Sequence, residues 1–348
     1  MNNDILFFAD LHLHERKEFN RSEGELGTRL QEGISILHQI ANIVKTNQIN
    51  NVVCLGDIFE LKDRVPNHIQ SAFGEALYAI DAHVYVLLGN HDFKIKKYPN
   101  IKVHHLGDLI TLVERPRCLV INGLKIGFIP YYRDYEDFKK AWTRLHNSNP
   151  EMDIVCFHQT LPGITFNTGK RVPGTFNLEL REGTKYISGH IHQTHEVFNK
   201  ILYLGSPYQV TFGEAGEDKF IWLYQPDIGK FKPLKLEYPE FRIVNISHTL
   251  TQKQIQGNYI KLTGNLTPDQ RGMVLEAKDH LRKWGAAGIT SDIRYMREIK
   301  KRMVTSSNTP QEVIPTFVGY MSKALIQHLD TKQLIRVGEA LLQEARQL

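Results

Sequence analysis

Apolar residues in the first 160 positions follow two spacings, one typical of buried strands and one typical of amphipathic helices. Short runs rich in β-branched residues have the length of strands, and stretches with apolar residues three and four positions apart lie between them. The strand-like runs are residues 5–10, 51–57, 83–90, 125–130 and 153–158, and the helical stretches are 28–44, 67–82 and 134–146. Near-continuous apolar strands that alternate with helices predict an α/β fold with a sheet buried on both faces. Thr28 and Gln31 suggest a weak capping box for the first helix, and Asn67 is placed to cap the second.

The pattern changes after His158 to short strands and turns, which predict a second β-rich layer of the same domain that ends near residue 236. The region 241–303 then suits a small α+β unit, with a strand at 258–263, a helix at 268–284 and a strand at 290–294. Residues 306–310, SSNTP, are a linker candidate before two amphipathic helices. We therefore expect a main domain at 1–238, an α+β domain at 239–305 and a helical hairpin at 306–348.

Composition is that of a soluble globular protein, with 41% hydrophobic and 23% charged residues. No apolar run approaches the roughly 18 residues of a membrane span, and the N-terminus lacks the basic flank of a secretory signal. Cys54, Cys118 and Cys156 lie in apolar, strand-like runs. These features predict reduced thiols and a cytoplasmic location.

The formal net charge of +5 is unevenly distributed along the chain. Residues 1–238 hold 27 Lys and Arg against 28 Asp and Glu, whereas residues 239–348 hold 16 against 10. The stretch 278–303 has eight basic and three acidic residues, beside aromatic residues such as Trp284 and Tyr295. Such a surface can contact the phosphates of nucleic acid, although an ordinary solvated helix face explains it equally well.

Polar residues that can bind metal follow five of the apolar runs. The five motifs are Asp10-Leu11-His12, Gly56-Asp57, Gly89-Asn90-His91-Asp92, His158 and Gly189-His190-Ile191-His192. Ligands gather beyond the carboxyl ends of the strands in an open α/β sheet, so we expect these residues at one rim. Carboxylate, amide and imidazole groups together suit divalent Mn, Fe, Zn or Mg rather than a thiolate site. Any single motif is most simply an ordinary core or surface feature, but five in chain order favour a metal cluster.

The order D-x-H, GD, GNHD, H and GHxH resembles that of the calcineurin-like metallophosphoesterases over about residues 4–225. The resemblance implies an α/β, four-layer α-β-β-α sandwich with two divalent metals that clamp a phosphoryl group and lower the pKa of a bound water. It also implies that Asp10, His12 and His192 hold one metal, that Asn90, His158 and His190 hold the other, and that Asp57 bridges both. His91 would be the catalytic histidine that protonates the leaving oxygen or stabilises the phosphorus.

Three neighbours of the motifs need separate interpretation. Glu60 stands where relatives have Asp or His, and it either orients His91 or, as we slightly favour, is a solvated loop residue. Asp92 is expected to be a structural partner of its loop rather than a ligand. His14 is either a neighbour of the site or a surface residue. The opening DLHLH also resembles PHP-type phosphoesterases, but GNHD and GHIH belong to the other family.

Residues 204–207, LGSP, and 212–214, FGE, resemble the segment that follows GHxH in SbcD-type DNA-repair exonucleases, including the compact phage-encoded subunits. This resemblance implies a nuclease with 3'-5' exonuclease activity on double strands and endonuclease activity on single strands, with manganese as the preferred metal. It further implies an α+β capping domain, a helical hairpin that docks on the coiled coil of an SbcC-like ABC ATPase, and a homodimer in that complex. The location would be the bacterial cytoplasm, or that of an infected host, without membrane contact.

Other functions fit the sequence less well than the nuclease. The sequences GDIFELKD and GNHD differ from the GDxxDRG and GNHE of protein phosphatases. A small-molecule or cyclic-nucleotide phosphodiesterase of the same fold is the main alternative, although such enzymes do not need the last hundred residues. A metal-bound scaffold without catalysis is disfavoured because His91 is present. The apolar stripes of the last two helices are slightly more typical of packing on their own domain than of a partner groove.

Overall fold

The computed structural model describes residues 3–16, 18–23, 26–62, 64–94, 98–99, 109–166, 169–296, 336–338 and 340. The chain divides into two compact units, residues 1–294 and residues 295–348. The predicted linker at 306–310 lies outside the described residues, and so does the predicted hairpin at 306–348 apart from helical backbone at 336–338 and 340. None of the described helices is long and apolar enough to cross a lipid bilayer.

The first of two six-stranded sheets contains the strands that lead to the N-terminal motifs. Its order is β16-β15-β1-β4-β5-β8, and its strands are β1 Ile5–Phe8, β4 Asn51–Cys54, β5 His83–Leu87, β8 Ile110–Val113, β15 Ile221–Gln225 and β16 Lys230–Leu234. Strands β1, β4, β5 and β8 are parallel, so their carboxyl ends meet at one edge. Strand β15 pairs antiparallel with both of its neighbours, β1 and β16.

The second sheet contains the strands that lead to the C-terminal motifs. Its order is β13-β14-β12-β11-β10-β9, and its strands are β9 Arg117–Ile121, β10 Leu124–Ile129, β11 Ile154–His158, β12 Lys185–Gly189, β13 His195–Val197 and β14 Ile201–Tyr203. Strands β10, β11, β12 and β14 are parallel, and the two edge strands are antiparallel.

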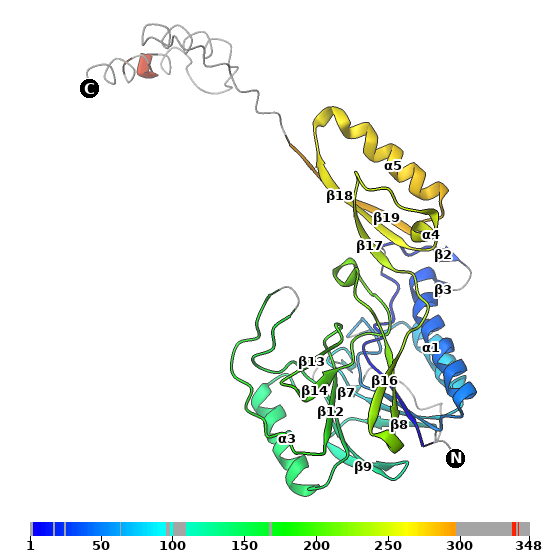
Figure 1. Ribbon diagram of the computed structural model, residues 1–348, viewed down its shortest axis with the longest axis vertical. Coiled ribbons are helices and arrows are strands. Elements are labelled where there is room, and N and C mark those ends of the chain that lie inside the picture. Colours follow the sequence, from blue (N-terminus) through cyan, green and yellow to red (C-terminus); the bar gives the residue numbers. More distant parts are fainter. Residues whose placement is uncertain are drawn as a thin grey trace. The chain divides into compact units, whose positions relative to one another are not determined.

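The two sheets pack face to face, and helices cover their outer faces (Figure 1). Alternate residues of a strand face opposite layers, so Phe7 lies between the sheets with Phe128 and Cys156, while Phe8 packs toward the helices. Helices α1 (Thr28–Asn47) and α2 (Asn67–Tyr78) cover the first sheet, and α3 (Tyr135–Ser148) covers the second. Each large apolar side chain buried this way contributes about 1.5–3 kcal/mol. The predicted four-layer sandwich is confirmed.

Two of the three predicted helix starts need correction. Helix α1 begins at Thr28 after Gly27, and no side chain caps it, because the Thr28 hydroxyl contacts the preceding turn instead. Helix α2 begins at Asn67 without a side-chain cap and ends at Tyr78, four residues before the predicted end. The third prediction was better, since the Asp134 carboxylate accepts hydrogen bonds from the first backbone amides of α3.

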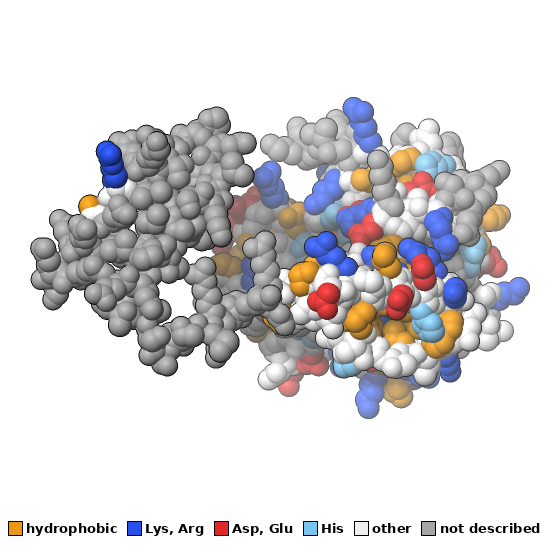
Figure 2. All heavy atoms as spheres, turned by 90° about the horizontal axis from the view of Figure 1, so that it is seen from above, with side chains coloured by type: hydrophobic (Ala, Val, Ile, Leu, Met, Phe, Trp, Pro, Cys, Tyr) orange, Lys and Arg blue, Asp and Glu red, His pale blue; other side chains and the backbone are white. Residues whose placement is uncertain are grey.

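A small α+β unit follows the sandwich and has a separate core. Its sheet, in the order β17-β18-β19, contains β17 Phe241–Asn245, β18 Tyr259–Leu266 and β19 Gly288–Tyr295, and its helices are α4 Gln252–Ile255 and α5 Arg271–Lys283. Val244, Ile260 and Leu281 pack in its core. The predicted strand–helix–strand order is thus confirmed, whereas the predicted domain limits at residues 238 and 305 stay a prediction. Figure 2 shows apolar side chains interspersed with charged ones on the face seen from above.

Shorter elements complete the described residues. They are the strands β2 Ser22–Glu23, β3 Leu26–Gly27, β6 Phe93–Lys94 and β7 Tyr98–Pro99, and the 3-10 helices η2 Phe212–Glu214, η3 Pro226–Ile228 and η4 Pro268–Gln270. Of these, η2 is the one that bears on the strand-end motifs, because it lies in the segment between the GHIH motif and β15.

Candidate metal centre

All seven predicted ligands come from the ends of parallel strands, and the structure brings them together. Asp10 and His12 follow β1, Asp57 follows β4 and Asn90 follows β5 in the first sheet. In the second sheet, His158 ends β11, and His190 and His192 follow β12. The carboxyl edges of the two sheets therefore form one rim, as expected for an α/β ligand site.

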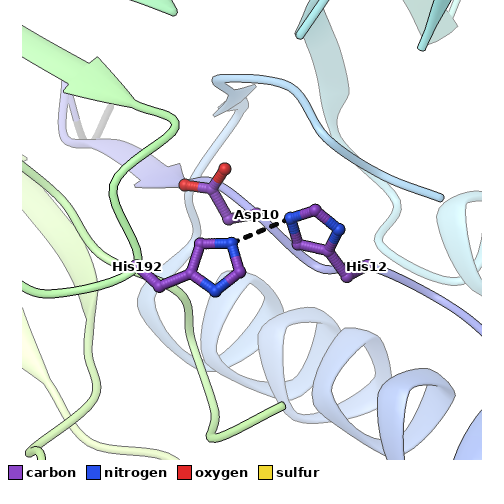
Figure 3. Close-up of side chains that lie close together, drawn as sticks. All are labelled: Asp10, His12 and His192. Atoms are coloured by element: carbon purple, nitrogen blue, oxygen red, sulfur yellow. Dashed lines mark hydrogen bonds between the residues drawn. The ribbon is translucent and has the colours of Figure 1, made fainter. Parts of the chain in front are cut away.

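Asp10, His12 and His192 form the first group at this rim (Figure 3). The Nε2 atoms of His12 and His192 lie 2.9 Å apart. The backbone N–H of His190 lies 3.0 Å from both carboxylate oxygens of Asp10, which fixes that side chain. One carboxylate and two imidazoles thus point at the same space.

Asp57, His158 and His190 form the second group, with Asn90 beside them. The Asn90 Oδ1 atom lies 2.5 Å from His190 Nδ1 and 3.2 Å from His158 Nε2. Asp57 Oδ2 lies 3.3 Å from His158 Nε2 and 3.6 Å from His12 Nε2 of the first group. One carboxylate oxygen therefore stands between the two groups, where a bridging ligand is needed.

Hydrogen bonds to the far ring nitrogen determine which nitrogen each histidine presents to the rim. His158 Nδ1 lies 2.6 Å from the carbonyl oxygen of Leu55, and His192 Nδ1 lies 3.0 Å from Glu214 Oε1. A nitrogen that donates a proton in this way leaves the other nitrogen, here Nε2, with its lone pair for a metal. The partners thus favour the tautomers that a metal site needs.

Several rim residues have a strained backbone conformation, which is common at functional sites. Asp10, His12, Asp57 and His190 have φ angles of 56°, 47°, 54° and 81°, in the left-handed region that non-glycine residues rarely adopt. Each such residue costs about 1–3 kcal/mol and persists only where surrounding contacts hold it. Four of the seven predicted ligands therefore have a conformation that the surrounding structure enforces.

Gly89 allows two motifs to approach each other closely. A Cβ atom at this position would lie 2.2 Å from Asp57 Oδ1 and 2.7 Å from His158 Cε1, which is closer than any real contact. The glycine of the GNHD motif is therefore required for packing, because the side chains of both Asp57 and His158 occupy the space beside it.

Burial and neighbouring charges shift the pKa values of the rim residues in different directions. Burial would raise the pKa of Asp57, but the neighbouring histidines, His158 foremost, hold that pKa well below the usual range of a carboxyl. Burial, reinforced by the charge of His158, lowers the pKa of His190 to about 3. Burial lowers the pKa of His158, but the Asp57 carboxylate outweighs it and raises that pKa to about 9, so a cation that binds His158 must displace its proton. An anionic Asp57 and a neutral His190 are the states that metal ligands adopt.

The donor atoms fit two divalent cations. Two nitrogens on one tetrahedral cation lie roughly 3.3 Å apart, since each is about 2.0–2.1 Å from the metal. The observed 2.9 Å between His12 Nε2 and His192 Nε2 is close to this spacing. No thiolate takes part, so nitrogen and oxygen donors favour Mn, Fe, Zn or Mg. The assignment of individual ligands to each cation stays a prediction.

The structure places the three ambiguous neighbours. Glu60 is not a solvated loop residue: its Oε2 lies 2.8 Å from His12 Nδ1 as an ion-pair contact without hydrogen-bond geometry, and its Oε1 pairs with Arg16. Its backbone carbonyl oxygen lies 2.7 Å from His91 Nδ1, so the main chain of Glu60 orients His91. His14 is buried, with Nδ1 2.7 Å from the carbonyl oxygen of His12.

Asp92 and Glu214 complete the surroundings. The buried Asp92 carboxylate accepts hydrogen bonds from the backbone amides of Asp57, Ile58 and Gly89, as expected for a structural partner of the loop. Glu214, which contacts His192, was not predicted as a site residue, because nothing near it in the sequence indicates a partner 22 positions away. Its one signal was the FGE segment that follows LGSP.

Comparison with known proteins agrees with this geometry. A family model described as calcineurin-like phosphoesterase matches residues 4–194. Protein 244L of Invertebrate iridescent virus 6, named as an inferred phosphoesterase, is 26% identical over 225 residues, covering 58% of this chain and 75% of that protein. Protein 078R of Invertebrate iridescent virus 3, named likewise, is 26% identical over 198 residues, covering 52% of this chain and 54% of that protein. The match therefore spans only about half of protein 078R.

Solved structures that match the chain have low sequence identity and low TM-scores. A protein of unknown function from Aquifex aeolicus is 16% identical with a TM-score of 0.30, and the match covers 48% of this chain and 81% of that one. A predicted phosphoesterase from Streptococcus pneumoniae is 11% identical with a TM-score of 0.29, and the match covers 64% and 81%.

Proposed function

The chain belongs to the calcineurin-like phosphoesterase family, and from that premise we propose that it is a two-metal nuclease that hydrolyses phosphodiester bonds in DNA. Metal-dependent hydrolysis of a phosphoester follows from the family. The proposal adds DNA as the substrate, 3'-5' exonuclease activity on double strands, endonuclease activity on single strands, and manganese as the metal. The observation that carries the hydrolytic part is the convergence of the seven predicted N and O ligands, with Asp57 between the two groups.

The residues at the rim would divide between two cations. When bound, two divalent cations neutralise phosphoryl charge and make a water acidic enough to attack at neutral pH. Asp10, His12 and His192 would hold one cation, and Asn90, His158 and His190 the other. The Asp57 carboxylate, with Oδ2 between the groups, would hold both at a fixed separation.

His91 is placed to move a proton. Its backbone N–H donates to Asp57 Oδ1 at 2.8 Å, which ties the residue to the metal groups. Its Nδ1 lies 2.7 Å from the carbonyl oxygen of Glu60, so Nε2 is the atom that can hold a proton for the leaving oxygen. His91 would thus act as the general acid while binding no metal.

DNA as the substrate is supported by features outside the rim. The LGSP and FGE segments resemble those of SbcD-type nucleases, and the α+β unit follows them in the same order. Helix α5 and strand β19 carry exposed Lys283 and Arg294, and residues 239–348 hold the basic excess of the chain. Lys and Arg that neutralise backbone phosphates are the general means of binding DNA without sequence preference.

The proposal extends to partners. We propose the division 1–238, 239–305 and 306–348 into nuclease domain, capping domain and docking hairpin. The hairpin would bind the coiled coil of an SbcC-like ABC ATPase, and the nuclease would act in that complex as a homodimer. Support comes from the apolar stripes of the hairpin and from the resemblance to SbcD-type subunits.

The test is hydrolysis by the purified full-length chain supplied with Mn²⁺. Linear duplex DNA should be degraded from its ends, and His91→Ala should abolish hydrolysis while the protein still binds its cations. Retained hydrolysis in that variant would contradict the role of His91. Turnover of cyclic nucleotides far above that of DNA would instead favour the alternative, a small-molecule phosphodiesterase of the same fold.

A further inference from the structure

Glu214 links the metal rim to a buried charge network. It lies in η2, and its Oε1 atom is 3.0 Å from Nδ1 of His192. Its Oε2 atom accepts a hydrogen bond from the Ser206 hydroxyl at 3.1 Å and from the backbone N–H of Val210 at 3.3 Å. The residue is 7% exposed, and its two carboxylate oxygens have different partners.

Lys219 holds this carboxylate from the other side. Its side chain is fully buried, and its Nζ lies 2.8 Å from Glu214 Oε2 and 2.9 Å from Glu217 Oε2. The same Nζ donates to the backbone carbonyl oxygen of His192 at 2.9 Å. Burial of an ammonium group costs several kcal/mol unless the group is paired. The three partners of Lys219 are the main chain of His192, the Glu214 carboxylate that contacts the His192 ring, and Glu217. The network therefore fixes both the ring and the main chain of one predicted ligand.

Within the described residues, the ring of His158 in the second group has a neutral partner behind it. His158, the corresponding ligand there, directs Nδ1 to the neutral carbonyl oxygen of Leu55 at 2.6 Å. A carboxylate behind an imidazole raises the basicity of the ring more than a carbonyl does, and it also fixes the tautomer and the ring orientation. His192 and His158 thus differ in the partner of Nδ1, which is a carboxylate for His192 and a carbonyl oxygen for His158.

We propose that Glu214 is a positioning residue that orients His192 and sets the cation affinity of the group Asp10, His12 and His192, with Lys219 holding Glu214 in place. The inference rests on the metal site of the proposed function, but it does not depend on DNA as the substrate. It predicts that loss of the Glu214 charge weakens one cation site and leaves the other unchanged.

The test is a titration of Mn²⁺ into the metal-free full-length chain by calorimetry, with elemental analysis of the loaded protein. The wild type should bind two cations. Glu214→Gln, which keeps the size and removes the charge, should weaken one site about 10- to 100-fold and leave the other at its wild-type affinity. Two unchanged sites in Glu214→Gln would contradict the proposal, and so would equal weakening of both.

A double-mutant cycle separates positioning from general stability. If Glu214 acts through the ring of His192, Glu214→Gln should cause no further loss of affinity in a His192→Ala background. A full further loss would mean that Glu214 acts through the fold at large, which would overturn the proposal. Ser206→Ala removes only one donor to the carboxylate and should weaken the same site about two- to tenfold. If Glu214→Gln does not fold, Ser206→Ala replaces it in the test. Wild-type Mn²⁺ affinity in Ser206→Ala would then contradict the proposal.

Glu32→Gln is the matched control. Glu32 is a largely buried carboxylate that pairs with buried Arg29 and accepts a hydrogen bond from Tyr259, and it contacts no predicted ligand in the described structure. Its substitution should lower the unfolding temperature but leave both Mn²⁺ affinities unchanged. A wild-type chain that binds no Mn²⁺ would instead contradict the metal site itself, so the two failures are distinguishable.

Discussion

Asp92 illustrates how single residues hold the rim together. Its carboxylate accepts hydrogen bonds from the backbone amides of Asp57 at 2.7 Å, Gly89 at 2.9 Å and Ile58 at 3.0 Å. Burial, followed by the negative charge of Asp57, raises the pKa of Asp92 to about 6. This one side chain joins the loop after β4 to the loop after β5. It therefore sets the spacing between Asp57 and Asn90 while its own oxygens are occupied by main-chain donors.

Gly89→Ala tests this close packing at the residue scale. The added Cβ would lie too close to Asp57 Oδ1, to the Asp57 backbone nitrogen and to His158 Cε1, so both side chains and the main chain at Asp57 must move. We expect a loss of about 1–3 kcal/mol in the free energy of unfolding and weaker binding of Mn²⁺ at the group that contains His158. Urea denaturation and calorimetric titration measure the two effects.

Gly272→Ala is the control for that substitution. Gly272 lies in α5, and a Cβ there would meet nothing within 4 Å. Replacement of a helical glycine by alanine should leave the Mn²⁺ affinities unchanged and stabilise the helix by up to about 1 kcal/mol. Wild-type Mn²⁺ affinity in Gly89→Ala would contradict the packing argument.

The residues that sequence could predict are those with a local signal. The seven predicted ligands follow apolar strands within short motifs, and the structure brings all seven together. Glu60 was misread because its partner, His12, lies 48 positions away. Glu214 was missed for the same reason, since only the fold places it beside His192. Contacts between distant segments need the tertiary structure, whereas strand-end motifs do not.

At the scale of elements, the interior pattern of each strand and helix was easier to predict than its ends. Strand periodicity identified both sheets because buried strands are apolar along most of their length. Helix starts depended on residues outside the helix. The Thr28 hydroxyl at the start of α1 contacts the backbone of Phe19 and Arg21, so it does not form the predicted capping box. The start of α3 was predicted to within one residue, at Asp134, and the cap bonds of Asp134 are local, to the residues two and three positions later.

Helix α3 leads to a prediction about pH. His146 is buried, its Nδ1 lies 2.9 Å from the Trp142 carbonyl oxygen, and its ring stacks on Trp142 with centroids 4.5 Å apart. Burial, more than any other effect, lowers the pKa of His146. The unfolded chain therefore binds a proton below about pH 6.5 that the folded chain does not, so stability falls as pH drops below that value.

His146→Gln removes this titration and keeps a hydrogen-bonding side chain. From about pH 6.5 to about pH 5, the wild type should lose free energy of unfolding more steeply than the variant, by at most about 1.4 kcal/mol per pH unit. Urea denaturation at several pH values measures the difference. Parallel curves for the two proteins would show that folding does not disfavour the charged form of His146.

At the scale of the whole molecule, the α+β unit is joined to the sandwich by polar and aromatic contacts. The Arg29 guanidinium of α1 lies 5.1 Å from the ring centroid of Phe241 and 4.9 Å from that of Tyr259. The Tyr259 hydroxyl donates to Glu32 at 2.5 Å, and the backbone N–H of Phe241 donates to Gln209 Oε1 at 2.6 Å. Such contacts place the unit against α1 and against the segment that contains Glu214. None of them could be predicted from local sequence.

The proposed DNA substrate, together with the uneven charge of the chain, leads to a prediction about salt dependence. Lys283→Ala with Arg294→Ala removes two exposed cations from the α+β unit, and Lys45→Ala with Lys232→Ala removes two exposed cations from the sandwich. The first pair should weaken DNA binding and reduce the slope of log K against log salt by up to about 1.8, because each lost phosphate contact contributes about 0.9. The second pair should leave the slope near the wild-type value. Fluorescence anisotropy with labelled duplex at several salt concentrations measures both, and equal slopes for the two variants would contradict a DNA surface on the α+β unit.

The cation stoichiometry of the purified chain tests the central claim most directly. Asp57 stands between the two groups, with Oδ2 3.3 Å from His158 Nε2 and 3.6 Å from His12 Nε2. Elemental analysis after loading with Mn²⁺ and removal of the excess should find two cations per wild-type chain and at most one per Asp57→Ala chain. A wild-type chain that carries no stoichiometric cation under any loading condition, or an Asp57→Ala chain that still carries two, would contradict the account.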